Sequence, residues 1–384
     1  MLETRLLPLM VEMRQRGIRI DVERMEQMDA ELVARRDAGL AKLKAVAGFD
    51  VNVNAAADIS RLFKKLGITA GQTESGRESF AKDTLIKSDI GKLIMEIRAH
   101  EKFSGTSISG LRDLQIDGRV HTQFNQLKND EYGTVSYRFS SATPNLQNIP
   151  KRDDEWGPKL RGLFIPENDC QLLSCDYSQI EYRLLVHYGI GEGADDARKI
   201  YRDDRNADFH EMASKITGVP RKIAKGLNFG IVYGMGIGAL AESLGIARDD
   251  AESKMNEYHR LLPFVKNTSF EVSRRAKNKG FITLLDGRQR RFPDPQMCYK
   301  ALNALLQGGA AVIMKKAMVD LYESGIFDKT GFPHLTVHDE LVVSIPHGME
   351  NSVAEIESIM ENVWPLKIPL LVNSKLGKNW GMEE

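Results

Sequence analysis

Cysteine is scarce in this chain of 384 residues, and its placement argues against a disulfide or zinc framework. The three cysteines are Cys170, Cys175 and Cys298, and no two of them form a CxxC pair. A few isolated thiols are typical of a protein that works in a reducing compartment. We therefore expect a cytoplasmic protein.

Long apolar runs and an excess of one charge are also missing. No hydrophobic stretch approaches the roughly 20 residues of a membrane span, and the N-terminus has no signal-peptide pattern. The 53 basic and 53 acidic residues cancel, which disfavours a surface that binds polyanions all over. The zero net charge does not exclude a basic groove on one side of the protein, because residues 273–292 carry seven Lys or Arg against one Asp. For that run taken alone, a solvated face is the simpler interpretation.

The rest of the composition, with 42% hydrophobic and 28% charged residues, is that of a globular protein. At 384 residues the chain is too long for one compact core, so we expect subdomains. Amphipathic spacing predicts helices over 21–48, 56–68 and 81–103, with a Gly-, Ser- and Thr-rich loop over 71–79. Beyond Asp117, strand and helix patterns mix.

The stretch "LLSCDYSQIEYR" is an apolar strand that runs into a helix, with Asp176 where the strand ends. A carboxylate there is costly unless it is paired or bound to a cation. Aspartate also caps helices well at such a junction. For Asp176 taken alone, the helix cap is the stronger interpretation.

A second polar block, His338, Asp339 and Glu340, interrupts the apolar hairpin "HLTVHDELVVSI". Two Asp residues on neighbouring strands can hold two Mg²⁺ ions about 3.5–4 Å apart, which serves in-line phosphoryl transfer. Aspartate is equally common in surface turns. Either aspartate alone leaves the choice between metal ligand and structural role open.

The segment "RKIAKGLNFGIVYG" places Arg221, Lys225, Phe229 and Tyr233 four residues apart, along one helix face. Cations suit a triphosphate, and aromatic rings suit a base and sugar. A core helix would not align cations with rings, and a solvent face would not spend two aromatics. The alternative is an amphipathic helix whose long cations reach solvent.

These three segments resemble motifs A, B and C of the A-family DNA polymerases, the DNA polymerase I family of bacteria and their phages. "SYRFSSATPNLQNIP", "TLLDGRQRRFP" and "NALLQGGAA" are similar to further segments of that family, in the family's order. The resemblance covers essentially the whole chain. It implies an α+β right-hand fold, with a palm of residues 1–20, 116–190 and 266–384, a thumb of 21–115 and fingers of 191–265.

The resemblance implies a template-directed DNA polymerase that adds deoxynucleotides to a primer 3′-hydroxyl by two-metal-ion phosphoryl transfer. Asp176 and Asp339 would bind two Mg²⁺ ions, for which Mn²⁺ could substitute, with the backbone carbonyl of Tyr177 as a further ligand. Glu340 would be an accessory carboxylate. Lys225 is the expected general acid toward pyrophosphate.

The resemblance also implies how nucleotide and DNA are bound. Glu181 would be a steric gate against the ribose hydroxyl, and Phe229 in place of Tyr predicts discrimination against dideoxynucleotides. The other residues expected at the nucleotide are Arg221, Lys225, His210, Gln179 and Tyr233, the last at the templating position. Residues expected to contact primer and template are Arg138, Asn145, Gln147, Asn148, Arg288, Asn303, Gln307 and His338.

Three positions depart from the family pattern. Tyr137 stands where Gly is usual, Phe139 replaces a Leu, and Tyr182 follows the gate glutamate where Leu is usual. The interval of 11 residues from His210 to Arg221 (221 − 210) is like that of phage enzymes.

The expected partners are primer–template DNA and dNTPs, and also phage or host replication factors. We expect a monomer with no membrane partner, in the nucleoid of a bacterium or a phage-infected cell. We also expect no 3′→5′ exonuclease activity, because no acidic exonuclease motif fits before the polymerase motifs.

Three other functions use parts of the same pattern. A metal-dependent nuclease or phosphatase could use the two aspartates, but it would leave the cation–aromatic helix idle. A single-subunit RNA polymerase shares the three motifs, although the Glu181 gate argues against ribonucleotides. A non-catalytic DNA-binding protein would have no need of the carboxylate pair.

Overall fold

The structure, a computed structural model, describes residues 2–73, 75–151, 153 and 155–382. The chain forms two compact units, the larger comprising residues 1–17, 122–148 and 166–384, and the smaller comprising residues 18–121 and 149–165. In the described residues, no helix has the length and apolar character needed to cross a bilayer.

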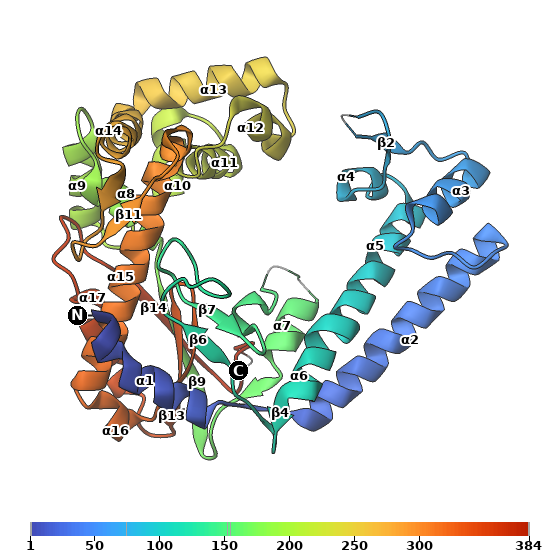
Figure 1. The fold of residues 1–384 in the computed structure, drawn as a ribbon, viewed down its shortest axis with the longest axis horizontal. Coiled ribbons are helices and arrows are strands. Elements are labelled where there is room, and N and C mark those ends of the chain that lie inside the picture. Colours follow the sequence, from blue (N-terminus) through green and yellow to red (C-terminus); the bar gives the residue numbers. More distant parts are fainter. Residues whose placement is uncertain (1, 74, 152, 154, 383–384) are drawn as a thin grey trace. The chain divides into compact units, whose positions relative to one another are not determined.

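The smaller unit is built on two long helices, α2 and α5, which pack along each other (Figure 1). α2 starts where the Asp21 carboxylate accepts a hydrogen bond from the Arg24 N–H, and it ends at Gly48 with φ of 75°. Leu43, Ile59 and Phe63 lie in the core of this unit. Its elements are β1 (Ile18–Ile20), α2 (Val22–Ala47), α3 (Ala56–Leu66), β2 (Gly71–Gln72), β3 (Glu78–Ser79), α4 (Lys82–Leu85), α5 (Asp89–Lys102), the π-helix η1 (Phe103–Ile108), α6 (Ser109–Leu114), β4 (Gln115–Ile116), β5 (Arg119–Val120), α7 (Trp156–Arg161) and β8 (Phe164–Ile165).

Two details of the smaller unit differ from the sequence-based expectation. The segment over 71–79, expected to be a loop, contains the short antiparallel pair β2–β3. The helix expected over 81–103 is interrupted, because the Ser88 hydroxyl accepts from the Gly91 N–H and starts α5 anew.

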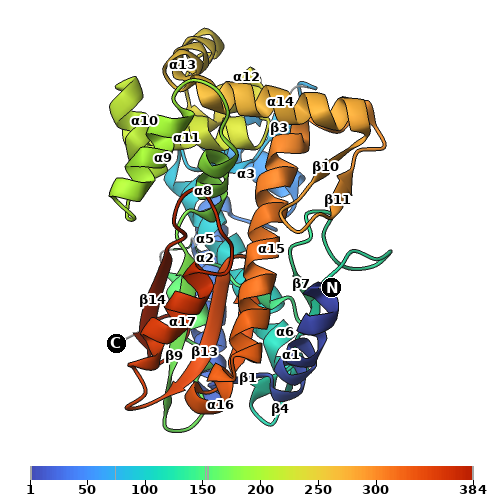
Figure 2. The same ribbon diagram turned by 90° about the vertical axis from the view of Figure 1, so that its left-hand side faces the viewer.

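The larger unit is organised around an antiparallel sheet of order β12-β13-β9-β14. The central strand β9 buries Leu172, Leu173 and Cys175 completely. The long helix α15 packs against α8, α17 and α1 (Figure 2). Its strands and first helices are α1 (Leu2–Arg16), β6 (Gln123–Asn125), β7 (Ser140–Ala142), the 3₁₀ turn η2 (Leu146–Asn148), β9 (Cys170–Tyr177), α8 (Ile180–Tyr188), β12 (Pro333–Val337), β13 (Glu340–Pro346) and β14 (Val372–Gly377).

The remaining elements of this unit are mostly helices, and all of them except α17 lie between β9 and the hairpin β12–β13 in the chain. Among them, α11 packs on both α10 and α12, and α13 packs on α12 and α14. The elements are α9 (Ala194–Asp203), α10 (Phe209–Thr217), α11 (Arg221–Val232), α12 (Ile237–Leu244), α13 (Arg248–Leu261), α14 (Pro263–Lys279), β10 (Phe281–Thr283), β11 (Gln289–Arg291), the 3₁₀ segment η3 (Pro295–Lys300), α15 (Ala301–Glu323), α16 (Ile326–Thr330) and α17 (Ser352–Glu361). The expected mixture of helices and strands after Asp117 is confirmed.

Candidate active site

The sheet brings the two candidate aspartates to neighbouring positions. Asp176 lies in β9, where it pairs with Glu340, the first residue of β13. Asp339 precedes Glu340 in the turn between β12 and β13, and its carbonyl oxygen accepts a hydrogen bond of 3.1 Å from the Tyr177 N–H. The edge of the sheet therefore holds Asp176 beside the turn that carries Asp339.

The sequence left a structural interpretation open for each aspartate, a helix cap for Asp176 and a surface turn for Asp339, and the structure excludes only the first. The helix-cap interpretation of Asp176 is wrong, because α8 begins after Gln179 and Asp176 lies inside a strand that is paired on both sides. Asp339 does occupy a hairpin turn, in which His338 adopts φ of 60°. A turn position leaves a carboxylate near the surface, so it is compatible with metal binding.

Glu340 is fixed inside the sheet. Its side chain is only 5% exposed. Its Oε1 accepts hydrogen bonds from the Ser174 hydroxyl at 2.6 Å and from the Trp380 indole N–H at 2.9 Å. Ser174 lies two residues before Asp176 and therefore on the same face of β9. These contacts set the orientation of the carboxylate next to Asp176.

The donors at this edge fit a hard divalent cation. The Asp176 and Asp339 carboxylates and the Tyr177 backbone carbonyl are oxygen donors, which Mg²⁺ and Mn²⁺ prefer. Across the described ranges, no cluster of three or more His, Cys, Asp or Glu could enclose a metal ion. An ion at this edge would need further ligands from water or phosphate, as is usual for Mg²⁺.

The helix α11 carries the cation–aromatic stripe in the expected order. Arg221 and Lys225 are exposed, whereas Phe229 and Tyr233 are half-buried. The Phe229 and Tyr233 rings stack with their centroids 5.7 Å apart. Arg221 also forms an ion pair of 2.6 Å with Asp208. One end of the helix is therefore cationic and the other presents two stacked rings.

His210 is a buried, neutral member of this region. It is 6% exposed, and burial lowers the pKa of its imidazole to about 4. The Asn228 amide nitrogen lies 2.8 Å from His210 Nδ1, and Tyr258 donates its hydroxyl proton to the Asn228 carbonyl oxygen. This orientation of Asn228 makes Nδ1 an acceptor and places the imidazole proton on Nε2.

Glu181 joins α8 to the cation–aromatic helix. Its carboxylate forms an ion pair with Arg138, and it accepts a long hydrogen bond of 3.4 Å from the Tyr233 hydroxyl. The Glu181 side chain is 15% exposed. Tyr233, which directly follows α11, therefore meets α8, the helix that comes after the strand of Asp176.

Comparison with known proteins assigns the chain to a family. A model described as DNA polymerase family A matches residues 22–382. The chain belongs to that family.

Named relatives agree with the family assignment. The DNA-directed DNA polymerase of Pseudomonas phage M6 is 31% identical, over 99% of this chain and 65% of the phage protein. DNA polymerase I of Caldicellulosiruptor bescii is 34% identical, over 99% of this chain and 46% of that enzyme. The chain thus spans 65% of the length of the first relative and 46% of the second.

A solved structure confirms the expected right-hand polymerase fold. The POL domain of Pol1 from M. smegmatis, solved in complex with DNA primer-template and dNTP, matches with a TM-score of 0.87 and 27% sequence identity. The match covers 99% of this chain and 70% of that one.

The residues of this family A chain that we expected at DNA lie in several places. Gln147 donates its side-chain N–H to the Thr336 carbonyl oxygen of β12 at 2.9 Å, and Asn145 and Asn148 are exposed in the same segment. His338 is exposed at the hairpin turn. Asn303 and Gln307, one turn apart on α15, line a cavity of about 340 Å³ together with Arg290, Arg291 and Lys300. Whether these residues contact DNA stays a prediction.

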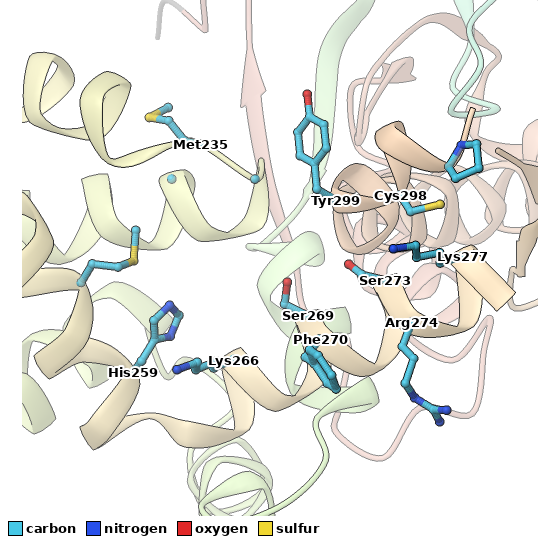
Figure 3. Close-up of a pocket in the computed structure, with 14 residues that line it drawn as sticks. Met235, His259, Lys266, Ser269, Phe270, Ser273, Arg274, Lys277, Cys298 and Tyr299 are labelled. Atoms are coloured by element: carbon cyan, nitrogen blue, oxygen red, sulfur yellow. The ribbon is translucent and has the colours of Figure 1, made fainter. Parts of the chain in front are cut away.

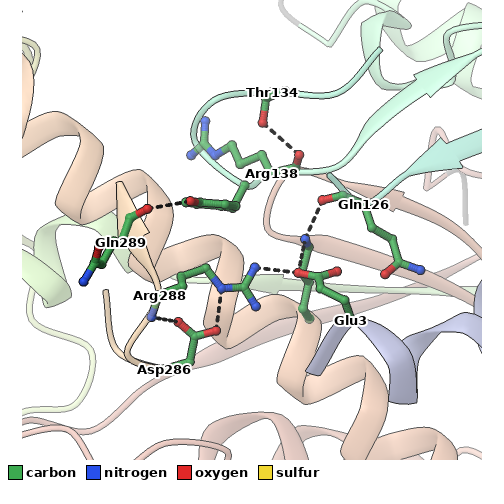
Figure 4. A network of polar contacts seen from close by, with 9 residues as sticks. Glu3, Gln126, Thr134, Arg138, Asp286, Arg288 and Gln289 are labelled. Carbon is green, nitrogen blue, oxygen red and sulfur yellow. Dashed lines mark hydrogen bonds and ion pairs between the residues drawn. The ribbon is translucent and has the colours of Figure 1, made fainter. Parts of the chain in front are cut away.

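Arg288 is held by carboxylates within the larger unit. It donates to Asp286 and to Glu3, with both distances 2.6 Å (Figure 4). Glu3 also accepts from the fully buried Lys315 at 2.8 Å. A contact between Arg288 and a DNA phosphate would therefore compete with Glu3 and Asp286.

Two of the three residues that depart from the family pattern, Tyr137 and Phe139, contact this ionic network. Tyr137 adopts φ of 63°, a left-handed conformation in which glycine is favoured. Its hydroxyl donates to the Gln289 carbonyl oxygen at 2.8 Å, and the Arg288 guanidinium lies 5.1 Å from its ring centroid. The Phe139 ring lies 5.2 Å from the Lys315 ammonium. Both aromatic substitutions thus contact cations of the network.

The third departure, Tyr182, packs against α11 through Phe229. Its ring stacks on Phe209 at 5.2 Å and meets His210 and Phe229 edge-on at 4.6 and 6.2 Å. It is 7% exposed, and its hydroxyl has no hydrogen-bond partner among the described residues. Tyr182 thus supports Phe229, a role that the sequence pattern did not indicate.

Arg183 was also missed by sequence reasoning. It is 1% exposed and donates to the carbonyl oxygens of Ser178, Pro369 and Arg205 at 2.7–2.9 Å. It thereby ties the start of α8 to the segments before β14 and α10. Gln179 adds a similar tie, because its side-chain oxygen accepts from the Phe209 N–H at 3.0 Å. No local pattern predicts the acceptors at Pro369 and Arg205, because they lie 186 and 22 positions from Arg183.

Proposed function

We propose that this family A chain catalyses template-directed extension of a DNA primer, adding deoxynucleotides to the 3′-hydroxyl. The observation that carries the proposal is the contact between the Tyr233 hydroxyl and Glu181. It joins the cation–aromatic helix to α8, and α8 follows directly on the strand that places Asp176 beside Asp339. A nuclease or phosphatase would need the aspartates but not this joined helix.

Each group at the site has a distinct task in this reaction. Asp176, Asp339 and the Tyr177 carbonyl would hold two Mg²⁺ ions, which activate the primer hydroxyl and neutralise the leaving phosphate. Arg221 and Lys225 bind the triphosphate, and Lys225 donates a proton to the departing pyrophosphate. His210 contributes as a neutral donor through Nε2, since burial keeps its pKa at about 4. Glu340 orients the carboxylate edge from within the sheet.

Substrate selection rests on Glu181 and Phe229. The Glu181 carboxylate, held by Arg138 and Tyr233, occupies the position of a ribose 2′-hydroxyl and excludes ribonucleotides. Phe229 stacks on the incoming sugar and base, and its lack of a hydroxyl disfavours dideoxynucleotides. Gln179 lines the same pocket, and Tyr233 holds the templating position.

We further propose that residues 1–20, 116–190 and 266–384 act as palm, 21–115 as thumb and 191–265 as fingers. The thumb assignment is supported by the separate compact unit that comprises residues 18–121 and 149–165. Primer–template DNA would be contacted by Arg138, Asn145, Gln147, Asn148, Asn303, Gln307 and His338, with Arg288 engaged after release from Glu3. The protein named in the solved relative was in complex with primer-template and dNTP, which supports this substrate class.

Primer extension with Mg²⁺ tests the proposal. We expect the wild type to extend a labelled primer with dNTPs and not with NTPs, and we expect Asp339→Ala to lose at least a thousandfold in rate. Asp203→Ala, an exposed carboxylate at the end of α9, serves as the matched control and should keep full activity. Extension by Asp339→Ala at the control rate would contradict the two-metal assignment, and degradation of the template without extension would favour a nuclease.

A further inference from the structure

Three buried polar side chains, Tyr258, Asn228 and His210, form a hydrogen-bonded triad across three helices. Tyr258 of α13 donates its hydroxyl proton to the Asn228 carbonyl oxygen on α11, and the Asn228 amide nitrogen lies 2.8 Å from His210 Nδ1 on α10. Asn228 and Tyr258 are each 1% exposed. The hydrogen bonds of the triad are therefore made out of contact with bulk water.

The triad lies in an apolar core. Met212 on α10, Leu227 on α11 and Met255 on α13 belong to the same buried cluster as Tyr258. A buried amide costs free energy unless its polar groups are hydrogen-bonded, and an aliphatic side chain would avoid that cost. We therefore expect Asn228 to have a role that a leucine could not fill.

Two aromatic rings hold the His210 imidazole in place. Tyr182 meets it edge-on with the ring centroids 4.6 Å apart, and Phe229 stacks on it at 6.2 Å with an interplanar angle of 21°. Among the described residues, the hydrogen bond at Nδ1 is the only one that the imidazole makes. Nε2 is therefore left for a ligand, and its protonation decides which ligand it can take.

The imidazole of His210 is uncharged at neutral pH, so only its tautomer can vary. Burial lowers its pKa to about 4, an effect that the nearby carboxylate opposes and the two nearby cations reinforce. The two nearby phenols stay neutral, because burial raises the pKa of each. These titratable neighbours are Asp208 before α10, Arg221 and Lys225 on α11, Tyr182 on α8 and Tyr258 on α13.

The direction of the hydrogen bonds determines the tautomer of His210. The Asn228 carbonyl oxygen accepts from the Tyr258 hydroxyl, so the Asn228 NH₂ group faces Nδ1 and this nitrogen is the acceptor. In a neutral imidazole the proton then lies on Nε2. An Nε2–H group donates to a phosphate oxygen, whereas the opposite tautomer would turn a lone pair toward it.

We propose that Asn228 and Tyr258 are positioning residues, which hold His210 in the tautomer that donates a hydrogen bond from Nε2 to the triphosphate of the incoming nucleotide. Asn228 acts directly on Nδ1. Tyr258 prevents the Asn228 amide from rotating by half a turn, which would present an acceptor to Nδ1 instead of a donor. The triphosphate as the ligand rests on the proposed function, whereas the tautomer rests on the hydrogen bonds alone.

NMR of the protein labelled with ¹⁵N in its histidines tests the tautomer without any substrate. The ¹⁵N shift of each imidazole nitrogen depends on whether that nitrogen carries the proton, so the two tautomers have different spectra. We expect His210, assigned by the loss of its signals in His210→Gln, to carry its proton on Nε2 from about pH 6 to about pH 8. Tyr258→Phe should change this spectrum to that of a mixture of tautomers.

His259 is the matched control, because it follows Tyr258 on α13 but has no such partner. It lines a cavity of about 640 Å³ between α13 and α14 (Figure 3). Its Nδ1 is buried and has no hydrogen-bond partner among the described residues. Asn228→Asp should therefore leave the tautomer of His259 unchanged, and His259→Gln should leave the KM for dNTPs unchanged.

The variant Asn228→Asp provides a kinetic measurement. Its carboxylate has no N–H to donate, so it accepts from Nδ1 and raises the pKa of the His210 imidazole. His210 is then an imidazolium at low pH, and at high pH it is the tautomer with a lone pair on Nε2. The ratio of the variant KM for dNTPs to the wild-type KM should rise about tenfold from about pH 6 to about pH 9, with a smaller change in kcat.

The double variant separates positioning from a merely structural role. In the His210→Gln background, Asn228→Asp should give a KM ratio that does not depend on pH. The same pH dependence with and without His210 would overturn the positioning role. If Asn228→Asp does not fold, the spectrum of Tyr258→Phe decides, and an unchanged tautomer there overturns the role of Tyr258.

The NMR result also separates this proposal from the proposed function. A proton on Nδ1 of His210 in the wild type overturns the positioning role, even if the protein extends primers. If the wild type shows the proton on Nε2 but extends no primer, the proposed function fails, and the triphosphate as the ligand of Nε2 fails with it.

Discussion

At the scale of single residues, burial decides the charge of two histidines in the larger unit. His210 is buried and His187 is half-buried, and desolvation lowers the pKa of each imidazole to about 4. An unfolded chain binds a proton on each imidazole below its ordinary pKa of about 6.5. The stability that depends on these neutral histidines is therefore present above pH 6.5 and is lost as the pH falls toward 4.

The variant His210→Gln tests this pH dependence. Between pH 7 and pH 5 the wild type should lose on the order of 1–2 kcal/mol of unfolding free energy through His210, and the variant should be spared that loss. Urea unfolding at the two pH values measures it. The exposed His347→Gln is the control and should behave like the wild type. Equal losses in all three proteins would show that His210 is not kept neutral by the fold.

Residue roles were predictable where a local pattern carried them. The Asp21 cap and the Gly48 stop of α2 follow from the sequence because both act within one helical turn. Tyr182 and Arg183 could not be predicted in the same way. Their partners Phe209, Pro369 and Arg205 lie 22 to 186 positions away in the sequence. They meet Tyr182 and Arg183 only in the folded chain.

At the scale of elements, Gly226 has a packing role in α11. A Cβ added to Gly226 in α11 would lie 2.4 Å from Leu244 Cδ2 of α12. A Cβ added to Gly238, inside α12, would meet nothing within 4 Å. Gly226 therefore allows α12 to approach α11 closely, whereas Gly238 serves no such purpose.

Two alanine substitutions distinguish packing from intrinsic helix stability. Gly226→Ala should lower the unfolding free energy by about 1–3 kcal/mol, because overpacking forces α11 and α12 apart. Gly238→Ala should raise it by a few tenths up to about 1 kcal/mol, because alanine has the higher helix propensity. Thermal or urea unfolding of both variants checks the signs. A stabilised Gly226→Ala would mean that Leu244 moves aside without cost.

Elements with strong local periodicity were predicted well, and those that depend on distant pairing were not. The helices α2 and α3 and the strand-to-helix passage from β9 to α8 have the expected positions. The pair β2–β3 was missed because each strand has only two residues and its stability comes from the partner. Asp176 was interpreted as a helix cap for the same reason. The local sequence does not show that β13 and β14 pair with β9 on its two sides.

At the scale of the larger unit, one ionic cluster joins segments that are far apart in the chain. Glu3 on α1 accepts from Arg288 beside β11 and from Lys315 on α15, across 285 and 312 positions of sequence. Burial lowers the pKa of Lys315, although Glu3 counteracts this. Lys315 is fully buried, so its charge is tolerated only because Glu3 and the Gln126 carbonyl oxygen face it.

The variant Glu3→Gln should therefore be costly. Removing one partner of a buried ion pair leaves the other charge uncompensated, for which about 3 kcal/mol of unfolding free energy is expected. Denaturant unfolding measures the loss, and Glu12→Gln on the same helix is the matched control. Recovery of stability in the double variant Glu3→Gln with Lys315→Met would identify the buried ammonium as the cause. A wild-type midpoint for Glu3→Gln would contradict the argument.

The central position of β9 determines how readily backbone amides at the carboxylate edge exchange with solvent. Its backbone is hydrogen-bonded to β13 on one side and to β14 on the other, so its amide protons exchange with solvent only when the sheet opens as a whole. The turn between β12 and β13 lies at the end of a hairpin, beyond the pair Val337–Glu340, so it can open without the rest of the sheet. Deuterium uptake should then be slower across β9, which includes Asp176, than in the turn that joins β12 to β13.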